Sequence, residues 1–201
     1  MPARLQFWFD PASTYAYLSA MRIEAMAANR HVEVEWRPFL LGPIFKAQGW
    51  NTSPFNVYPQ KGRYMVRDID RIAAARRLQP FRLPDPFPAR SNKAARLALL
   101  VADQERIAPF MRALFQKAFA DGRDISDGDV LRECLRTAGV PEVDALIAAA
   151  DEPPVKDRLR RETEHALSLG VFGAPTFVAP DGELFWGDDR LEQAIGWSAA
   201  V

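Results

Sequence analysis

Residues 5–18 read LQFWFDPASTYAYL and join a short apolar run to a helical pattern across a break. The first five are mostly apolar and aromatic, which is typical of a buried strand, and Asp10-Pro11 ends that run. Over residues 15–29 apolar side chains recur at roughly helical spacing, and Ser13 or Thr14 is suited to cap the helix. The stretch therefore predicts a strand, a turn and a helix in succession.

The next segment predicts a second strand. In residues 31–36 the side chains of Val32, Val34 and Trp36 alternate with two glutamates, as in a half-buried strand. Two strands joined by a helix favour a parallel pair with a crossover connection.

The middle of the chain is predicted to be almost entirely helical. Two segments interrupt it: an irregular loop over residues 49–59, long enough to suggest a function, and an extended, proline-rich stretch over residues 79–88. The predicted helices cover residues 40–48, 62–78, 91–102, 109–120, 127–137, 141–150 and 153–169.

The C-terminal end returns to strands. Residues 176–179 and 183–186 flank Asp181-Gly182, a strong hairpin signal, and Asp188 begins a last helix that runs to about residue 197. We therefore expect an α/β fold of the order β-α-β … β-β-α, with a four-stranded sheet and a large all-helical insertion. The predicted division is a discontinuous domain of residues 1–40 and 170–201, and an insertion of residues 41–169.

Composition narrows the functional classes. The 201 residues carry 26 basic and 26 acidic side chains, so the zero net charge predicts neither nucleic acid nor an anionic membrane as partner. The single cysteine, Cys134, cannot form an internal disulfide, and no Cys/His cluster has metal-ligand spacing. The chain shows no basic and apolar leader and no long apolar run, so we expect a cytoplasmic protein.

Three segments, in this order, carry a resemblance that spans nearly the whole chain. They are FWFDPASTYAYL (7–18), WRPFLLG (36–42) with KGRYM (61–65), and GVFGAPTF (170–177) with FWGDDRL (185–191). Together they resemble the 2-hydroxychromene-2-carboxylate isomerases, which are relatives of kappa-class glutathione transferases and of disulfide-forming thioredoxin-fold oxidoreductases. The resemblance implies a thioredoxin-like fold and glutathione as cofactor.

Ser13 is the catalytic residue that the resemblance implies. Disulfide-forming relatives begin the first helix with Cys-x-x-Cys, but here the motif is Ser-Thr-Tyr-Ala, so dithiol chemistry at this site is excluded. In the glutathione-dependent branch a serine at the first position hydrogen-bonds the glutathione sulfur. The alternative is that Ser13 only caps the helix. Thr14 and Ala16 depart from the Ser-Pro-Tyr-Ser that is common in that branch, which leaves the preferred substrate open.

Further glutathione-binding residues also follow from the resemblance. It places a cis-proline at Pro175, with the Ala174 backbone pairing with the cysteinyl part of glutathione; the alternative is a simple loop entering a strand. Asp189 would accept from the γ-glutamyl ammonium, while Asp188 either binds the ligand or caps the last helix. The resemblance adds two residues of the loop after the second strand, Asn51 and Lys61. The alternatives are that Asn51 only forms a turn and that Lys61 is only a solvated cation.

Three functions remain open from the sequence. The first is a glutathione-dependent isomerase that acts on a small aromatic substrate, the second a kappa-like glutathione transferase, and the third a non-catalytic thioredoxin-like binding protein. Either Tyr15 or Tyr17 is placed to face the substrate pocket, and Cys134 is predicted to be a buried helix residue. The family resemblance further implies a homodimer.

Overall fold

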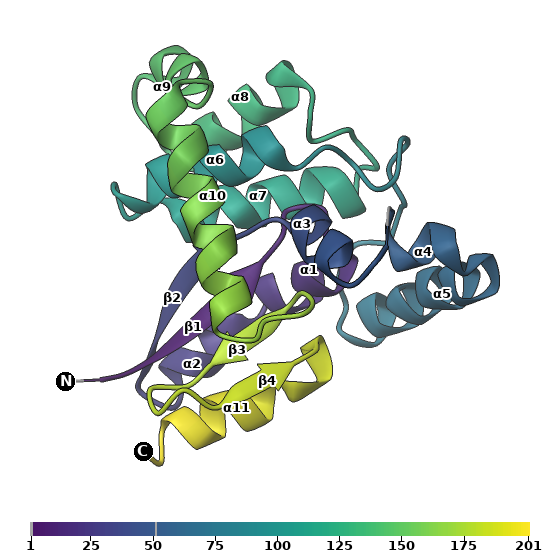
Figure 1. The fold of residues 1–201 in the computed structure, drawn as a ribbon, viewed down its shortest axis with the longest axis vertical. Coiled ribbons are helices and arrows are strands. Elements are labelled where there is room, and N and C mark those ends of the chain that lie inside the picture. Colours follow the sequence, from purple (N-terminus) through teal and green to yellow (C-terminus); the bar gives the residue numbers. More distant parts are fainter. Residues whose placement is uncertain (1, 51) are drawn as a thin grey trace.

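A mixed four-stranded sheet organises the computed structural model, which describes residues 2–50 and 52–201 (Figure 1). The strand order is β2-β1-β3-β4; β1 is parallel to β2 and antiparallel to β3, which is antiparallel to β4. The strands are β1 (Ala3–Phe9), β2 (Val32–Pro38), β3 (Thr176–Val178) and β4 (Leu184–Trp186).

The helices occupy the connections and the C-terminus. Those of the two chain ends are α1 (Thr14–Ala20), α2 (Ile23–Ala28), the 3₁₀ turn η1 (Asp188–Arg190) and α11 (Leu191–Ser198). Those of the middle are α3 (Leu41–Ala47), α4 (Pro54–Val57), α5 (Pro59–Ala75), α6 (Asn92–Ala102), α7 (Ile107–Phe119), α8 (Gly128–Thr137), α9 (Val143–Ala149) and α10 (Pro153–Ser168). The predicted order β-α-β, helices, β-β-α is confirmed.

Strand β1 is the centre of the fold because both of its faces are buried. Phe7 lies opposite Trp36 on one neighbouring strand and Phe177 on the other, with ring centroids 4.9 Å and 5.5 Å away. Its neighbour Trp8 points to the opposite face and packs with Ile44 of α3 and Ala166 of α10. A strand that is apolar on successive positions is stable only when it is covered on both sides.

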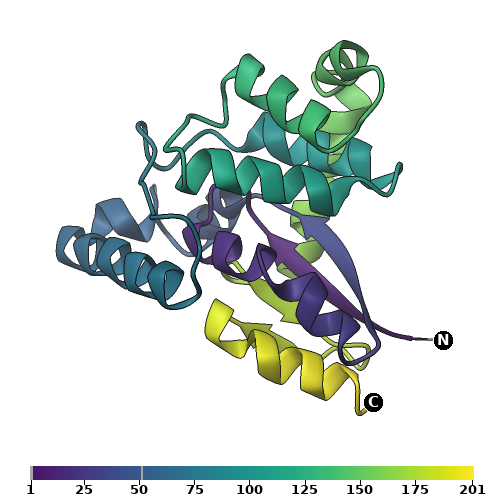
Figure 2. The same ribbon diagram turned by 180° about the vertical axis from the view of Figure 1, so that it is seen from behind.

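Helices supply that cover in two layers. The long helix α10 crosses one face of the sheet in Figure 1, and the purple and yellow helices α2 and α11 lie over the other face in Figure 2. The strand-bearing ends and the helical middle contribute to one buried cluster, so the division of residues 1–40 and 170–201 from 41–169 stays a prediction. Within the described residues, no helix is both long and apolar enough to cross a membrane.

Two local predictions were wrong. The helix expected over residues 15–29 is broken into α1 and α2 at Arg22, whose backbone (φ −136°) leaves helical angles while its guanidinium binds Asp188. A tertiary contact therefore breaks the helix where no glycine or proline is present. The loop expected over residues 49–59 contains the short helix α4 and the start of α5.

Gly62 allows α4 and α5 to pack closely. A Cβ atom at this position would lie 2.6 Å from the backbone oxygen of Phe55, which cannot move away without shifting α4. We expect Gly62→Ala to lower the free energy of unfolding by about 1–3 kcal/mol, because backbone must be displaced. Urea unfolding measures this change.

Gly42→Ala is the matched control for that substitution. Gly42 also lies in a helix, but a Cβ atom at this position would have no neighbouring atom within 4 Å. Alanine there should leave stability unchanged or raise it by up to about 1 kcal/mol. Equal losses in the two variants would contradict the close packing of α4 on α5.

Candidate functional site

A cavity of about 1120 Å³ lies at the N-terminal end of α1. Its walls come from the β1–α1 turn, α3, α5, the segment before α6, the loop before β3 and the turn after β4. Of the predicted site residues that the structure describes, all line this cavity: Ser13, Lys61, Ala174, Pro175, Asp188 and Asp189. The remaining one, Asn51, lies outside the described residues.

Ser13 is held between the helix and the loop before β3. It is the N-cap of α1: its Oγ accepts a hydrogen bond from the Ala16 N–H at 3.2 Å. The same hydroxyl donates to the carbonyl oxygen of Ala174 at 3.2 Å. Ser13 therefore caps α1, and its single hydroxyl proton is donated to Ala174; to bind a ligand atom at the helix N-terminus, the hydroxyl would turn that proton from the carbonyl to the ligand.

The Ala174–Pro175 peptide bond is cis, as predicted. Gly187 N–H donates to the Pro175 carbonyl at 3.0 Å, which fixes this loop against the turn after β4. Among the described residues no acceptor is paired with the Ala174 N–H. The backbone thus offers a donor beside Ser13, as pairing with an extended ligand requires.

Asp10 is a buried carboxyl group that sequence reasoning noted only as a strand breaker. Its two oxygens accept from the N–H groups of Ala12 and Leu41, each at 2.8 Å, and its carbonyl accepts from Ser13 N at 2.9 Å. Burial raises the pKa of Asp10, and the two backbone N–H donors act in the opposite direction. One side chain therefore ties the turn that carries Ser13 to the first residue of α3.

The two tyrosines of α1 have different places. Tyr15 lines the cavity, and its hydroxyl donates to Asp68 of α5 at 3.1 Å. Burial, and next the charge of Asp68, raise the pKa of Tyr15, so it remains a neutral phenol. Tyr17 is buried and packs against Phe115 and Phe119 instead. Of the pair, only Tyr15 lines the cavity.

Comparisons with known proteins identify the family of the chain. A model of the DSBA-like thioredoxin domain matches residues 4–195. The chain belongs to the DsbA-like thioredoxin family. This confirms the predicted thioredoxin-like fold.

Two similar proteins are named for activities of different kinds. The chain is 30% identical to a 2-hydroxychromene-2-carboxylate isomerase of Sphingobium xenophagum, covering 96% of both chains. It is 29% identical to glutathione S-transferase kappa 2 of Caenorhabditis elegans, covering 99% of this chain and 94% of that one. These similarities confirm the resemblance to the 2-hydroxychromene-2-carboxylate isomerases that the sequence indicated. They also confirm that the chain is an isomerase-like enzyme.

A solved structure of a 2-hydroxychromene-2-carboxylate isomerase has the same fold. It superposes with a TM-score of 0.84 at 23% identity, covering 96% of this chain and 95% of that chain. At this identity the likeness concerns the fold alone.

Asp188 has its carboxylate engaged inside this DsbA-like domain. Oδ1 accepts from Ser19 Oγ at 2.9 Å and pairs with Arg22 at 3.3 Å, while Oδ2 pairs with Arg76 at 2.6 Å. The helix-capping alternative is not seen, because these are the carboxylate's partners and Gly187 is the N-cap of η1. The Asp188 carbonyl also accepts from Arg22, at 2.8 Å, so among the described residues the backbone N–H is the part of Asp188 left for a ligand in the cavity.

Asp189 and Lys61 are exposed on the cavity wall. Asp189 pairs loosely with Arg190, at 3.6 Å, and Lys61 lies in the first turn of α5, two residues after its start. No carboxylate among the described residues is paired with Lys61. Both side chains are therefore accessible to a charged ligand.

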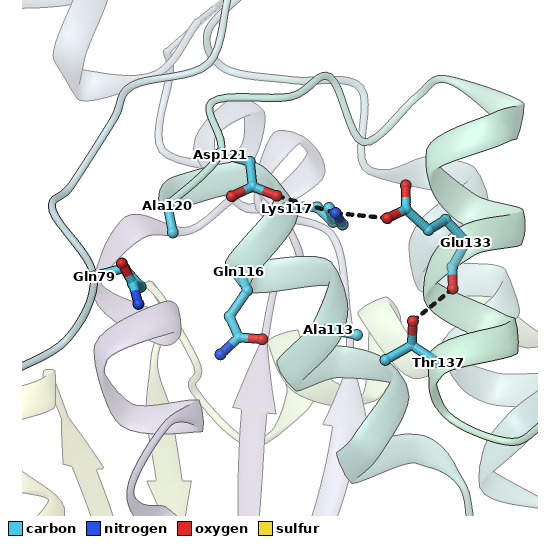
Figure 3. Close-up of a pocket in the computed structure, with 8 residues that line it drawn as sticks. All are labelled: Gln79, Ala113, Gln116, Lys117, Ala120, Asp121, Glu133 and Thr137. Carbon is cyan, nitrogen blue, oxygen red and sulfur yellow. Dashed lines mark hydrogen bonds and ion pairs between the residues drawn. The ribbon is translucent and has the colours of Figure 1, made fainter.

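A second, smaller pocket of about 510 Å³ lies between α7 and α8. Figure 3 shows Lys117 between Asp121 and Glu133, and these contacts are 3.1 Å and 2.6 Å long. Lys117 pairs with both carboxylates of this lining, Glu133 also pairs with Arg123, and the lining shares no residue with the cavity at Ser13. In the described part of the chain there is also no group of three His, Cys, Asp or Glu able to hold a metal ion.

Cys134 is buried in α8, as predicted, and does not belong to the cavity. Burial raises the pKa of its thiol to about 12. We expect the native protein to react with a disulfide reagent such as dithiobis(nitrobenzoate) at least about 100-fold more slowly than the urea-unfolded chain. Rapid reaction of the native protein would show that this DsbA-like chain has an accessible thiol after all.

Proposed function

We propose that the protein is a glutathione-dependent isomerase that interconverts 2-hydroxychromene-2-carboxylate and trans-o-hydroxybenzylidenepyruvate, a reaction of aromatic compound degradation. The observation that carries this proposal is the position of Ser13. It sits at the start of α1, in hydrogen-bond contact with Ala174 beside a cis-proline, and opens into a cavity of about 1120 Å³. The 30% identity to the Sphingobium xenophagum isomerase supports the same reaction.

The residues present fit glutathione. Ser13 and the first-turn N–H groups of α1 favour an anion at this point, because the helix N-terminus carries a partial positive charge. The Ala174 N–H suits the cysteinyl backbone, and Asp189 suits the γ-glutamyl ammonium. The exposed Lys61 suits a carboxylate, with Asn51 in the chain region that the family uses for the same purpose.

The chemistry divides between cofactor and protein. Bound glutathione supplies a thiolate, whose reversible addition to a conjugated carbon turns a double bond into a single bond that can rotate. Ser13 holds the sulfur as an anion, and Ala174 orients the tripeptide. Tyr15, kept neutral by its surroundings, donates its hydroxyl proton to Asp68 and so joins α1 to α5 at the cavity wall. The net reaction consumes no glutathione.

A kappa-like glutathione transferase is the second candidate, favoured by the 29% identity to glutathione S-transferase kappa 2. The same residues would hold the thiolate, but the product would retain the glutathionyl group. Conjugation of a chloro-nitroaromatic compound without isomerisation supports this candidate. A non-catalytic binding protein, the third candidate, would show neither reaction. We expect a cytoplasmic homodimer by family likeness.

Ser13→Ala tests the assignment. The variant loses the hydroxyl donor to the sulfur, so kcat/KM for isomerisation of 2-hydroxychromene-2-carboxylate at saturating glutathione should fall about 10²–10³-fold. Loss of the N-cap costs about 1 kcal/mol of stability, and a thermal melt separates that effect from catalysis. Ser168→Ala, at an exposed serine near the end of α10, is the control that should leave both values unchanged. Unaltered turnover in Ser13→Ala would exclude the proposed role.

A further inference from the structure

The wall of the cavity that comes from the helical middle carries groups that the glutathione-binding set does not use. Of the glutathione-binding set, Ser13, Ala174 and Asp189 come from the strand-bearing ends of the chain, and Lys61 comes from α5 of the helical middle. The helical middle contributes Phe55 of α4 and Phe87 and Arg90 of the segment before α6. The part of this wall that carries Phe55, Phe87 and Arg90 is therefore available to a second ligand in the same cavity as Ser13.

Arg90 places an uncompensated positive charge on this wall. Its side chain is exposed, and within residues 2–50 and 52–201 no carboxylate forms an ion pair with it. The other arginine of the lining, Arg190, pairs with Asp189 at 3.6 Å. A guanidinium presents paired N–H donors that match a carboxylate in two parallel hydrogen bonds.

The backbone that carries Arg90 is anchored to the catalytic turn. The flanking residues Ala89 and Ser91 are buried, and the Ser91 side chain acts to lower the pKa of Asp10. Asp10 in turn holds the turn that carries Ser13. The backbone on both sides of Arg90 is thus buried, and Arg90 and Ser13 line the same cavity.

An apolar surface lies beside the cation. The rings of Phe55 and Phe87 meet edge to face, with centroids 4.9 Å apart, and both line the cavity. A planar aromatic ligand can bury a face or an edge against this pair. A carboxylate on such a ligand would extend from the apolar surface toward the guanidinium.

We infer that Arg90 binds the carboxylate of the electrophilic substrate, and that Phe55 and Phe87 receive its aromatic ring. Arg90 is then a specificity-determining residue that favours anionic over neutral electrophiles. The inference rests on the proposed function, because it assigns three lining residues that the glutathione-binding set does not use. Glutathione also carries carboxylates that could bind Arg90, so the experiment measures the substrate analogue and glutathione separately.

The test uses binding, so it does not depend on turnover. Calorimetry measures the affinity of protein saturated with S-methylglutathione for trans-2-hydroxycinnamate, an aromatic carboxylate, and for its methyl ester. A separate titration measures the affinity of the protein for glutathione alone. We expect Arg90→Ala to weaken cinnamate about tenfold, equivalent to about 1.4 kcal/mol, while the ester and glutathione change less than about twofold. Arg90→Lys should restore part of the loss, since it keeps the charge without the planar donor pair.

Arg63→Ala is the matched control, because Arg63 is an exposed arginine of α5 outside the lining. It should leave all three affinities unchanged. Equal weakening of cinnamate and ester in Arg90→Ala would indicate packing alone, and weakening of glutathione instead would assign Arg90 to the cofactor. Either result, or a wild-type protein that does not bind cinnamate, overturns the inference.

Failure of the proposed function gives a different pattern. Wild-type protein that does not bind glutathione contradicts the glutathione-dependent reaction. Cinnamate and its ester, measured on the protein without S-methylglutathione, then still decide whether Arg90 recognises the carboxylate.

Discussion

The hydrogen bond from Ser13 to the carbonyl of Ala174 joins two parts of the chain that are 161 residues apart. It exists because β1 is buried on both faces and has β2 on one side and β3 on the other. That arrangement places the start of α1 beside the loop that enters β3. Everything proposed for the cavity depends on this contact, since it brings a helix N-terminus, a hydroxyl group and an open backbone edge to one point. A change that separated β1 from β3 would therefore remove the site together with the fold.

The helical middle turns this meeting point into a cavity. Asp10 connects the catalytic turn to α3, and Tyr15 connects α1 to α5 through Asp68. Both links run from the strand-bearing part to the wall that would enclose a substrate. The sheet thus positions the reactive group, while the helices set the size and the polarity of the space above it. The helices that form the cavity wall can therefore change in sequence while the turn at Ser13 is kept, so the same fold can serve different substrates.

The sequence predicted the elements better than the contacts between distant residues. Alternation around Trp36 and the turn at Asp181-Gly182 are local signals, and the three strands that they predict, β2, β3 and β4, all formed. The break at Arg22 was missed because its cause, Asp188, lies far along the chain. Asp188 itself was predicted as a ligand-binding or capping side chain, but two arginines from different parts of the chain converge on its carboxylate. Asp10 and Arg90 were missed because their meaning depends on which segments meet, and periodicity carries no such information.

The most direct test of the glutathione thiolate at Ser13 is the ionisation of the bound thiol. Wild-type protein is titrated with reduced glutathione at several pH values, and the ultraviolet absorbance of the thiolate is followed, with S-methylglutathione as the blank. A free cysteine-type thiol has a pKa of about 8.5. Bound glutathione that is largely thiolate at neutral pH, with its pKa lowered by one unit or more, is the predicted result. Glutathione that does not bind, or that binds with an unshifted thiol pKa, would contradict the assignment of this site.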